Sequence, residues 1–282
     1  MQGKICVITG ANTGIGKTAA EALSRLGAHV VLVCRNREKG ARALADVTAA
    51  AAKGGRGGSA ELRIADLSSQ TEVRRVASEL LAAHRAIHVL VNNAGLALKQ
   101  RELTVDGIER TFAVNYLACF MLANLLLPAL RAAGNARIVN VSSEAHAGAK
   151  LELDNLQGER RYRNFAMYAA SKLEDVMFTF ALARRLGGSG VTANALHPGV
   201  VATEIWRQVP ILNALSRWFM LSPEKGALTT VYLAASPDVA GISGKYFIKC
   251  EPAKTVAASH DEAMQEKLWA TSVALSGVGA DI

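Results

Sequence analysis

Short hydrophobic runs that alternate with helix-like segments constrain the fold of this chain more than any other feature. The runs are apolar at successive positions, which is typical of strands in a parallel sheet covered on both faces. Strands are predicted at residues 4–9, 29–34, 61–66, 87–92, 136–142 and 191–197, with 245–249 as a candidate final edge strand. Helices are predicted at residues 15–26, 37–52, 71–84, 107–130 and 165–186. The alternation predicts an α/β fold in a single domain over residues 1–282, with a doubly wound, parallel, Rossmann-like sheet and helices on both faces.

The composition supports a large core and an anionic ligand. Half of the 282 residues are hydrophobic and a fifth are charged, which excludes a disordered chain. Basic residues number 32 against 24 acidic ones, giving a net charge of +8. Such an excess fits an anionic ligand, nucleic acid or an acidic membrane surface. No dense Lys/Arg block with interleaved aromatic residues is present, so we expect no nucleic-acid partner.

Cysteine and histidine spacing indicates neither a disulfide framework nor a metal site. The four cysteines are scattered, and Cys6 and Cys34 lie in strand-like runs, where a buried, reduced thiol is expected. The six histidines show no metal-ligand spacing, so no metal is expected. The longest apolar stretch, residues 116–130, is shorter than the ~20 residues of a membrane span. With no signal peptide at Met1, we expect a cytoplasmic protein without a membrane span, and leave peripheral membrane contact open.

A glycine-rich turn, TGANTGIGK at residues 9–17, follows the first predicted strand and opens the first predicted helix. Gly10 permits the tight turn, Gly14 lets the backbone approach a pyrophosphate, and Gly16 permits close packing of helix on strand. The helix N-terminus then offers free N–H groups and a positive dipole to phosphates. The residues expected to contact the phosphates are Gly10, Asn12, Thr13, Gly14, Ile15 and Gly16.

The end of the second predicted strand bears on which dinucleotide binds. A carboxylate there would hold the ribose 2′-hydroxyl of NAD, but the sequence continues Arg35-Asn36-Arg37. The absence of the acid and the presence of arginine favour a 2′-phosphate, and hence NADP(H). The alternative is that these arginines only solvate the start of the next helix.

Five motifs occur in the order typical of one known family. They are TGANTGIGK, NNAG at 92–95, VNVSS at 139–143, YAASK at 168–172 and HPGVVAT at 197–203. In this combination the chain resembles the short-chain dehydrogenase/reductase family. CRNREKG, DNLQGER at 154–160 and the 25-position interval from Ser143 to Tyr168 resemble its retinol-dehydrogenase-like branch. The membrane-bound members of that branch have an N-terminal hydrophobic anchor that this chain lacks.

The resemblance implies a catalytic set made of Ser143, Tyr168, Lys172 and Asn115. Tyr168 would act as general acid or base on a substrate oxygen, and Lys172 would place positive charge one helical turn away and bind the nicotinamide ribose. Ser143 would orient and polarise the substrate oxygen, whereas Ser142 would turn its hydroxyl toward the backbone. Asn115 would bind a water of the proton relay; its alternative role is at a helix kink satisfied by the backbone.

The resemblance also implies further contacts with the cofactor. Asp66 and Leu67 would meet the adenine, Asn93, Ala94 and Gly95 would pass beside the adenine ribose, and Pro198, Gly199, Val201 and Thr203 would frame the nicotinamide and pyrophosphate. His197, by contrast, is expected to pack at a strand end.

Together these features predict an NADP(H)-dependent oxidoreductase that interconverts a carbonyl, aldehyde or ketone, and an alcohol on a hydrophobic substrate. The alternative is a nonenzymatic NADP(H)-binding regulator or sensor with the same fold. Residues 204–221 carry large apolar side chains that would form a substrate lid or, equally well, pack in the core or against a partner or membrane. The apolar segments 107–130 and 165–186 are the family's usual pairing surface, so we expect a homodimer.

Overall fold

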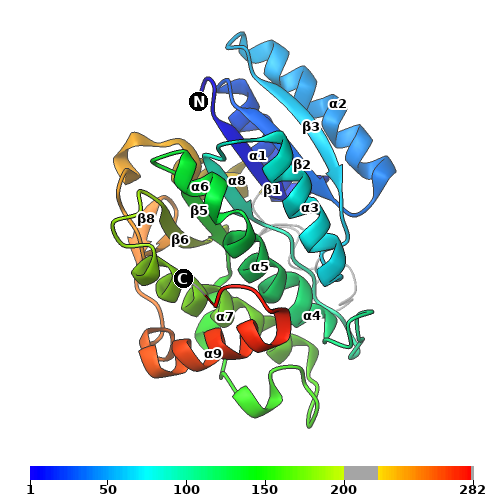
Figure 1. Ribbon diagram of the computed structural model, residues 1–282, viewed down its shortest axis with the longest axis vertical. Helices are drawn as coiled ribbons and strands as arrows, with labels where there is room; N and C mark the ends of the chain where they lie inside the picture. The colour runs from blue at the N-terminus through cyan, green and yellow to red at the C-terminus, as the bar shows by residue number, and fades with distance from the viewer. Residues whose placement is uncertain (200–221, 281–282) are drawn as a thin grey trace.

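A central eight-stranded sheet is the main feature of the computed structural model, which describes residues 1–199 and 222–280 (Figure 1). Its strand order is β3-β2-β1-β4-β5-β6-β7-β8, parallel from β3 to β7 and antiparallel only at β8. The strands are β1 Ile5–Thr9, β2 His29–Cys34, β3 Ser59–Ile64, β4 Val89–Asn92, β5 Arg137–Val141, β6 Thr192–His197, β7 Tyr246–Ile248 and β8 Glu251–Ala253. The predicted doubly wound parallel fold is therefore confirmed, and its strand order reverses between β1 and β4.

The last strands differ from the prediction at one edge of the sheet. The segment predicted to be the edge strand becomes β7, which is covered by β8 through a tight turn. Lys249 and Cys250 make that turn with φ values of 51° and 66°. The sequence did not indicate a turn here because these residues are neither glycine nor asparagine, the types that most readily adopt positive φ.

Helices cover both faces of the sheet (Figure 1). On one face α1 contacts α2 and α8, and on the other α3 contacts α5 while α7 lies beside them against β5 and β6. The helices are α1 Gly14–Arg25, α2 Arg37–Gly54, α3 Gln70–Ala83, α4 Arg110–Phe112, α5 Ala118–Leu125, α6 Leu127–Ala132, α7 Asn164–Arg185, α8 Pro223–Ala235 and α9 Glu262–Ser276. Short 3-10 helices lie at Glu144–Gly148, Leu153–Asn155, Pro237–Val239 and Ala257–His260. None of the described helices combines the length and hydropathy needed to cross a membrane.

The predicted helix at 107–130 is not one continuous α-helix. It begins at Arg110, where the Glu109 carboxylate accepts a hydrogen bond from the Phe112 amide at 2.7 Å. A π-helical turn, Ala113–Leu117, separates α4 from α5, and it contains Asn115. Such turns occur most often at functional sites.

The C-terminal helix α9 packs on the outer side of α5 and α7. The Trp269 ring lies 4.9 Å from that of Phe120 and 5.9 Å from that of Phe178, centroid to centroid. Tyr116 and Ser272 join the two layers through a 2.7 Å hydrogen bond between their hydroxyls. The homodimer through residues 107–130 and 165–186 stays a prediction, and the part of that surface in contact with α9 is not available for it.

Candidate active site

The glycine turn lies at the carboxyl end of β1, against the loop that follows β4. Gly10 has a φ of +65°, and a Cβ on it would lie 2.9 Å from the Cα of Ala94. A Cβ on Gly16 would lie 2.4 Å from Asn93 Nδ2 and 2.7 Å from the Gly10 carbonyl oxygen. Both positions therefore require glycine for the close approach of two loops. The N-cap residue Thr13 is exposed and makes no capping hydrogen bond, so the first N–H groups of α1 are left for a ligand.

The shape of this turn depends on Thr9 and Asn93. The Thr9 hydroxyl accepts hydrogen bonds from the amides of Asn93 and Ala94, at 2.9 and 3.0 Å. Asn93 donates from Nδ2 to the Thr9 carbonyl at 2.8 Å. The Asn93 side chain thus holds β1 and β4 together, which leaves the backbone of 93–95 as the part able to face a ligand.

The residues expected to recognise the adenosine half lie where β2 and β3 end. Arg35, Asn36 and Arg37 are exposed, and the Asn36 side chain caps α2 by accepting from the Lys39 amide at 2.9 Å. Asp66 accepts hydrogen bonds from the amide and hydroxyl of Ser68, at 3.0 and 2.8 Å. Leu67 and Ile15 are two further predicted contacts. Their side chains pack in hydrophobic clusters, so we expect them to contact the cofactor through their backbone.

The two serines after β5 have different environments, as the sequence predicted. Ser142 is buried and donates its hydroxyl to the Lys172 carbonyl at 2.7 Å. Ser143 is half-buried, and its Oγ accepts a hydrogen bond from the Ala145 amide at 3.2 Å. Because Oγ acts as an acceptor there, its O–H remains able to donate.

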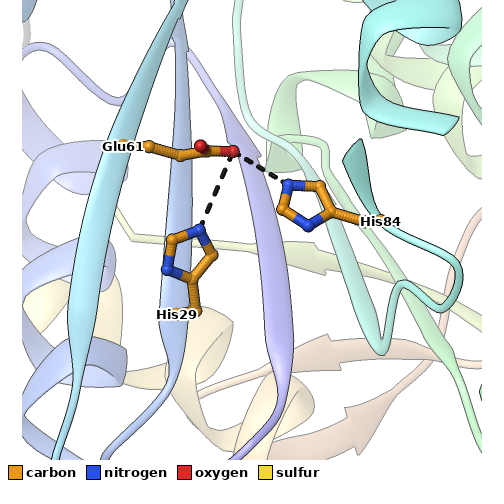
Figure 2. A group of neighbouring side chains, drawn as sticks. All are labelled: His29, Glu61 and His84. Atoms are coloured by element: carbon orange, nitrogen blue, oxygen red, sulfur yellow. Dashed lines mark hydrogen bonds and ion pairs between the residues drawn. The ribbon is translucent and has the colours of Figure 1, made fainter. Parts of the chain in front are cut away.

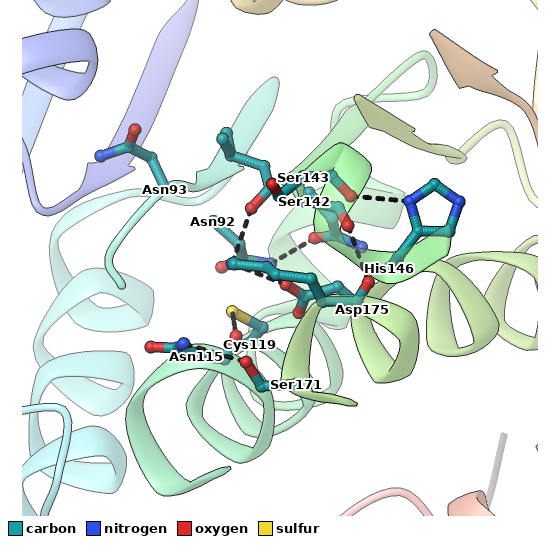
Figure 3. Close-up of polar contacts among 12 residues, drawn as sticks. Asn92, Asn93, Asn115, Cys119, Ser142, Ser143, His146, Ser171 and Asp175 are labelled. Carbon is teal, nitrogen blue, oxygen red and sulfur yellow. Dashed lines mark hydrogen bonds and ion pairs between the residues drawn. The ribbon is translucent and has the colours of Figure 1, made fainter. Parts of the chain in front are cut away.

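Two histidines flank the serine loop. His146 Nδ1 lies 2.6 Å from the Ser143 carbonyl oxygen, a contact that Figure 3 marks with a dashed line. His197 lies at the end of β6, as expected, where Nδ1 accepts from the Glu144 amide and Nε2 contacts the Glu144 carboxylate at 3.0 Å. Burial lowers the pKa of His146 and of His197, so both rings are held neutral near pH 7.

Tyr168 and Lys172 lie one turn apart on α7, and both are buried. The Lys172 ammonium is 6.0 Å from the centroid of the Tyr168 ring. Its nitrogen donates to the Val141 carbonyl at 2.9 Å and to the Asp175 carboxylate at 2.9 Å. Burial works to lower the pKa of Lys172, but the charge and hydrogen bond of Asp175, together with the nearby Tyr168 and Cys119, outweigh it and the pKa is raised. Burial raises the pKa of Asp175 to about 6, with Lys172 opposing the rise, so the pair is ionised at neutral pH.

Asn115 connects the π-helical turn to α7 and to the loop after β4. Its Nδ2 donates to the Leu96 carbonyl at 2.9 Å and to the Ser171 hydroxyl at 3.0 Å, while Oδ1 accepts from the Leu96 amide. Figure 3 shows Asn115 and Ser171 side by side. Its side chain is therefore satisfied at a distortion of the helix, as the alternative interpretation proposed. A Cβ on Gly95 would lie 3.6 Å from Asn115 Oδ1 and 3.8 Å from Lys172 Nζ, which brings the 93–95 backbone to the same place.

The structure thus brings together most of the predicted site at the carboxyl ends of the strands, where ligands bind in open α/β sheets. Pro198 and Gly199 follow β6 there, and Gly199 has a φ of +88°. Val201, Thr203 and the predicted lid at 204–221 lie outside the described residues.

Comparison with known proteins decides the family. A family model described as short chain dehydrogenase matches residues 4–211. Retinol dehydrogenase 14 from Mus musculus is 38% identical over 291 residues, which cover 99% of this chain and 87% of that protein. The chain belongs to the short-chain dehydrogenase/reductase family. It is an oxidoreductase of that family, similar to the retinol dehydrogenases, as its motifs predicted.

Solved structures of other proteins have the same fold. An uncharacterised protein from Mycobacterium paratuberculosis has a TM-score of 0.80 at 32% identity, over 98% of this chain and 94% of that one. A metagenomic short-chain oxidoreductase in complex with NADP has a TM-score of 0.65 at 29% identity, over 88% of this chain and 97% of that one.

The residues present fit the nicotinamide dinucleotide that this family uses. Gly10 and Gly16 let the glycine turn pack against the 93–95 loop, Thr13 leaves the first N–H groups of α1 uncapped, and no acidic residue stands in the first turn of α1 to repel phosphate. Gly95 and Lys172 would hold the nicotinamide end, and the arginines after β2 would hold the adenosine end.

Sequence motifs missed the polar residues behind the site. Asp175 pairs with Lys172, and Asn140 joins Asn92 to Thr179 by hydrogen bonds of 2.8 Å each. Thr179 donates in turn to the Asp175 carbonyl at 2.7 Å. The only signal available was the presence of Asp and Thr within an otherwise apolar helix, which does not say which face they occupy.

Proposed function

We propose that the protein is an NADP(H)-dependent oxidoreductase that interconverts a carbonyl and an alcohol on a hydrophobic substrate, with Tyr168 as the acid/base. The observation that carries the proposal is the Tyr168–Lys172 pair on α7, in which a fully buried lysine is kept charged by Asp175 beneath the phenol. A positive charge in that place favours the phenolate and so eases proton transfer in both directions.

The residues at the carboxyl ends of the strands would hold the cofactor, which would supply a hydride for the carbonyl carbon. The carbonyl oxygen takes the electron pair of the C=O bond, and Tyr168 donates its phenolic proton to that oxygen. Tyr168 later regains a proton from solvent. In the reverse direction Tyr168 accepts the proton of the alcohol. Ser143 donates a hydrogen bond to the same oxygen, since its Oγ already accepts from the Ala145 amide. Asn115 and Ser171 hold the π-helical turn against α7 and so fix the position of Tyr168.

The proposal of a hydrophobic substrate rests on the name of a relative and on the large apolar side chains of residues 204–221. The curated relative at 38% identity is named as a retinol dehydrogenase. Trp206, Trp218 and Phe219 stand in the segment after HPGVVAT, where a lid would cover the substrate.

Turnover of NADPH on a panel of carbonyls graded by size and hydrophobicity tests the function. We expect consumption with the larger apolar aldehydes or ketones, and a fall of about 10²–10⁴-fold in kcat for Tyr168→Phe, because general acid catalysis contributes rate of that order. NADPH binding should be retained in the variant. Tight NADPH binding without turnover on any carbonyl, or on alcohols with NADP⁺, would instead favour the nonenzymatic regulator.

The preference for NADP(H) rests on Arg35 and Arg37, which are exposed and form no ion pair with any residue that the structure describes. We expect the double variant Arg35→Ser, Arg37→Ser to bind NADPH about 10- to 100-fold more weakly, since charge-assisted hydrogen bonds are worth about 1.5–3 kcal/mol. Affinity for NADH should not change. Arg42→Ser is the matched control, because Arg42 is exposed on the same helix and paired with Glu38. Equal losses for both cofactors would show that the arginines do not read the 2′-phosphate.

A further inference from the structure

Two histidines and a glutamate form a cluster at the end of the sheet opposite the candidate active site. His29 is the first residue of β2, Glu61 lies in β3, and His84 is the C-cap of α3. Figure 2 shows the Glu61 carboxylate between the two imidazole rings. One Glu61 oxygen is 2.8 Å from His84 Nε2 and 3.7 Å from His29 Nε2. Nothing in the proposed reaction uses these residues.

The register of the sheet explains why residues so far apart in sequence meet here. His29 pairs with Ser59, and Val31 pairs with Glu61, so His29 and Glu61 point to the same face of the two strands. Val31 and Val33 on that face pack in the core with Val76 and Leu80 of α3. The end of α3 therefore brings His84 down onto the cluster.

We propose that His29, Glu61 and His84 form a binding site for a divalent transition-metal ion of the zinc class. Each residue offers one ligand atom, and the three atoms lie within 4.8 Å of one another. Zn–N and Zn–O bonds of about 2.0–2.1 Å place tetrahedral ligands about 3.3 Å apart, so small side-chain rotations suffice. Two imidazoles and one carboxylate, with water in the fourth position, suit Zn²⁺ and its neighbours better than Mg²⁺ or Ca²⁺.

The surroundings orient the ligands for this task. The Ser59 hydroxyl lies 2.7 Å from His29 Nδ1, which fixes the ring and leaves Nε2 for the ion. The side chains are 27% (His29), 26% (Glu61) and 12% (His84) exposed, so water can reach the fourth position. The site also lies at the C-terminal end of α3, where the helix dipole favours a cation.

Arg63 lies beside Glu61 and orients its carboxylate. Arg63 contacts the second Glu61 oxygen at 3.2 Å and leaves the first to face the histidines. Arg63 is itself balanced by Glu79 at 4.0 Å, which limits repulsion of a bound ion.

Titration of the full-length, untagged protein with Co²⁺ tests the site, because d–d absorption bands report an ordered coordination sphere. We expect one saturable equivalent per chain, displaced by Zn²⁺, without the charge-transfer band that a cysteine ligand would give. His84→Gln and His29→Gln should weaken binding at least tenfold, and Ser59→Ala about tenfold, as is usual for a residue that orients a metal ligand. His260→Gln, at an exposed histidine outside the cluster, is the control and should bind as wild type.

X-ray absorption of the Zn²⁺-loaded wild-type protein tests the same claim without any variant, and should show two imidazole nitrogens among four light ligands. NADPH affinity should not change with Zn²⁺, because the cluster lies away from the strand ends that hold the cofactor. Absence of stoichiometric binding, a thiolate signal, or unchanged binding in folded His84→Gln would overturn the proposal.

Discussion

Lys172 and Asp175 form an ion pair within a helix whose buried side chains are mostly apolar. Their side chains are 5% and 2% exposed, and a pair so deeply buried is costly unless both charges are needed. Residue motifs in the sequence pointed to Tyr168 and Lys172, but not to Asp175, because an acid in a helix is usually on its solvated face. The sheet and α7 together turn Asp175 inward, and no local pattern encodes that.

Asp175→Asn should shift the alkaline limb of the activity profile to lower pH. Without the carboxylate, the main opposition to burial is removed, and burial lowers the pKa of Lys172. Above that pKa, Lys172 no longer supports proton transfer at Tyr168. The measurement is kcat for carbonyl reduction against pH, from neutral to pH 10.

Glu174→Gln is the matched control for this variant. Burial raises the pKa of Glu174 well above its usual value, which favours the neutral side chain, and its Oε2 has no hydrogen-bond partner among the residues that the structure describes. We expect the control to keep the wild-type profile. An unchanged alkaline limb in Asp175→Asn, or the same shift in both variants, would show that Asp175 does not hold Lys172 charged.

The Asp175 carboxyl also makes the free energy of unfolding depend on pH. Folding raises the pKa of Asp175 from 3.8 to about 6, so the native state binds this proton more tightly than the unfolded chain. Its contribution to stability is therefore lost as pH rises from about 4 to about 6. The stability of wild type relative to Asp175→Asn should fall over that window, as measured by urea unfolding at each pH; a difference that is flat or rises would contradict the assignment.

At the scale of elements, the sequence predicted the strands and the position of the glycine-rich turn between β1 and α1 well, because both depend on local patterns. It failed where tertiary contacts decide. The π-helical turn at Ala113–Leu117 interrupts a segment whose apolar content indicated one helix. Helix α9 was missed because it buries Gln265, Ser272 and Ser276 as well as apolar residues, so its hydrophobic periodicity is weak.

Gly16→Ala tests the close packing of α1 on the loop after β4. The new Cβ would displace Asn93 and press on the Gly10 carbonyl, at 2.4 and 2.7 Å. We expect a loss of about 1–3 kcal/mol in unfolding free energy, as for other overpacked sites, and weaker NADPH binding by fluorescence titration. Gly148→Ala is the control, since nothing lies within 4 Å of its Cβ. Equal, small changes in unfolding free energy and NADPH affinity in the two variants would show that the two loops can accommodate an added methyl group.

At the scale of the whole molecule, α9 completes the core on the α5–α7 side. Trp269 is 6% exposed, and besides Phe120 and Phe178 it contacts Arg185, whose guanidinium carbon lies 4.0 Å from its ring. Arg184 and Arg185 also pair with Glu266. Helix α9 therefore contributes to the stability of the fold.

Trp269→Ala should destabilise the protein by about 3–5 kcal/mol, the usual cost of removing a buried Trp side chain. Urea unfolding measures it, and Lys267→Ala, at an exposed position on the same helix, is the control. Light scattering on both variants also reports whether uncovering α5 and α7 changes the oligomeric state. A loss below about 1 kcal/mol, as at an ordinary surface position, would mean that α9 is not part of the core.

The most direct test of the central claim is the fate of deuterium carried at both hydrogen positions of the nicotinamide C4 of NADPH. With the best carbonyl of the panel, the wild-type protein should give an alcohol with one deuterium on the carbinol carbon, and Tyr168→Phe should give almost none in the same time while still binding NADPH. An alcohol without deuterium, or equal product from the two proteins, would contradict hydride transfer with Tyr168 as the acid.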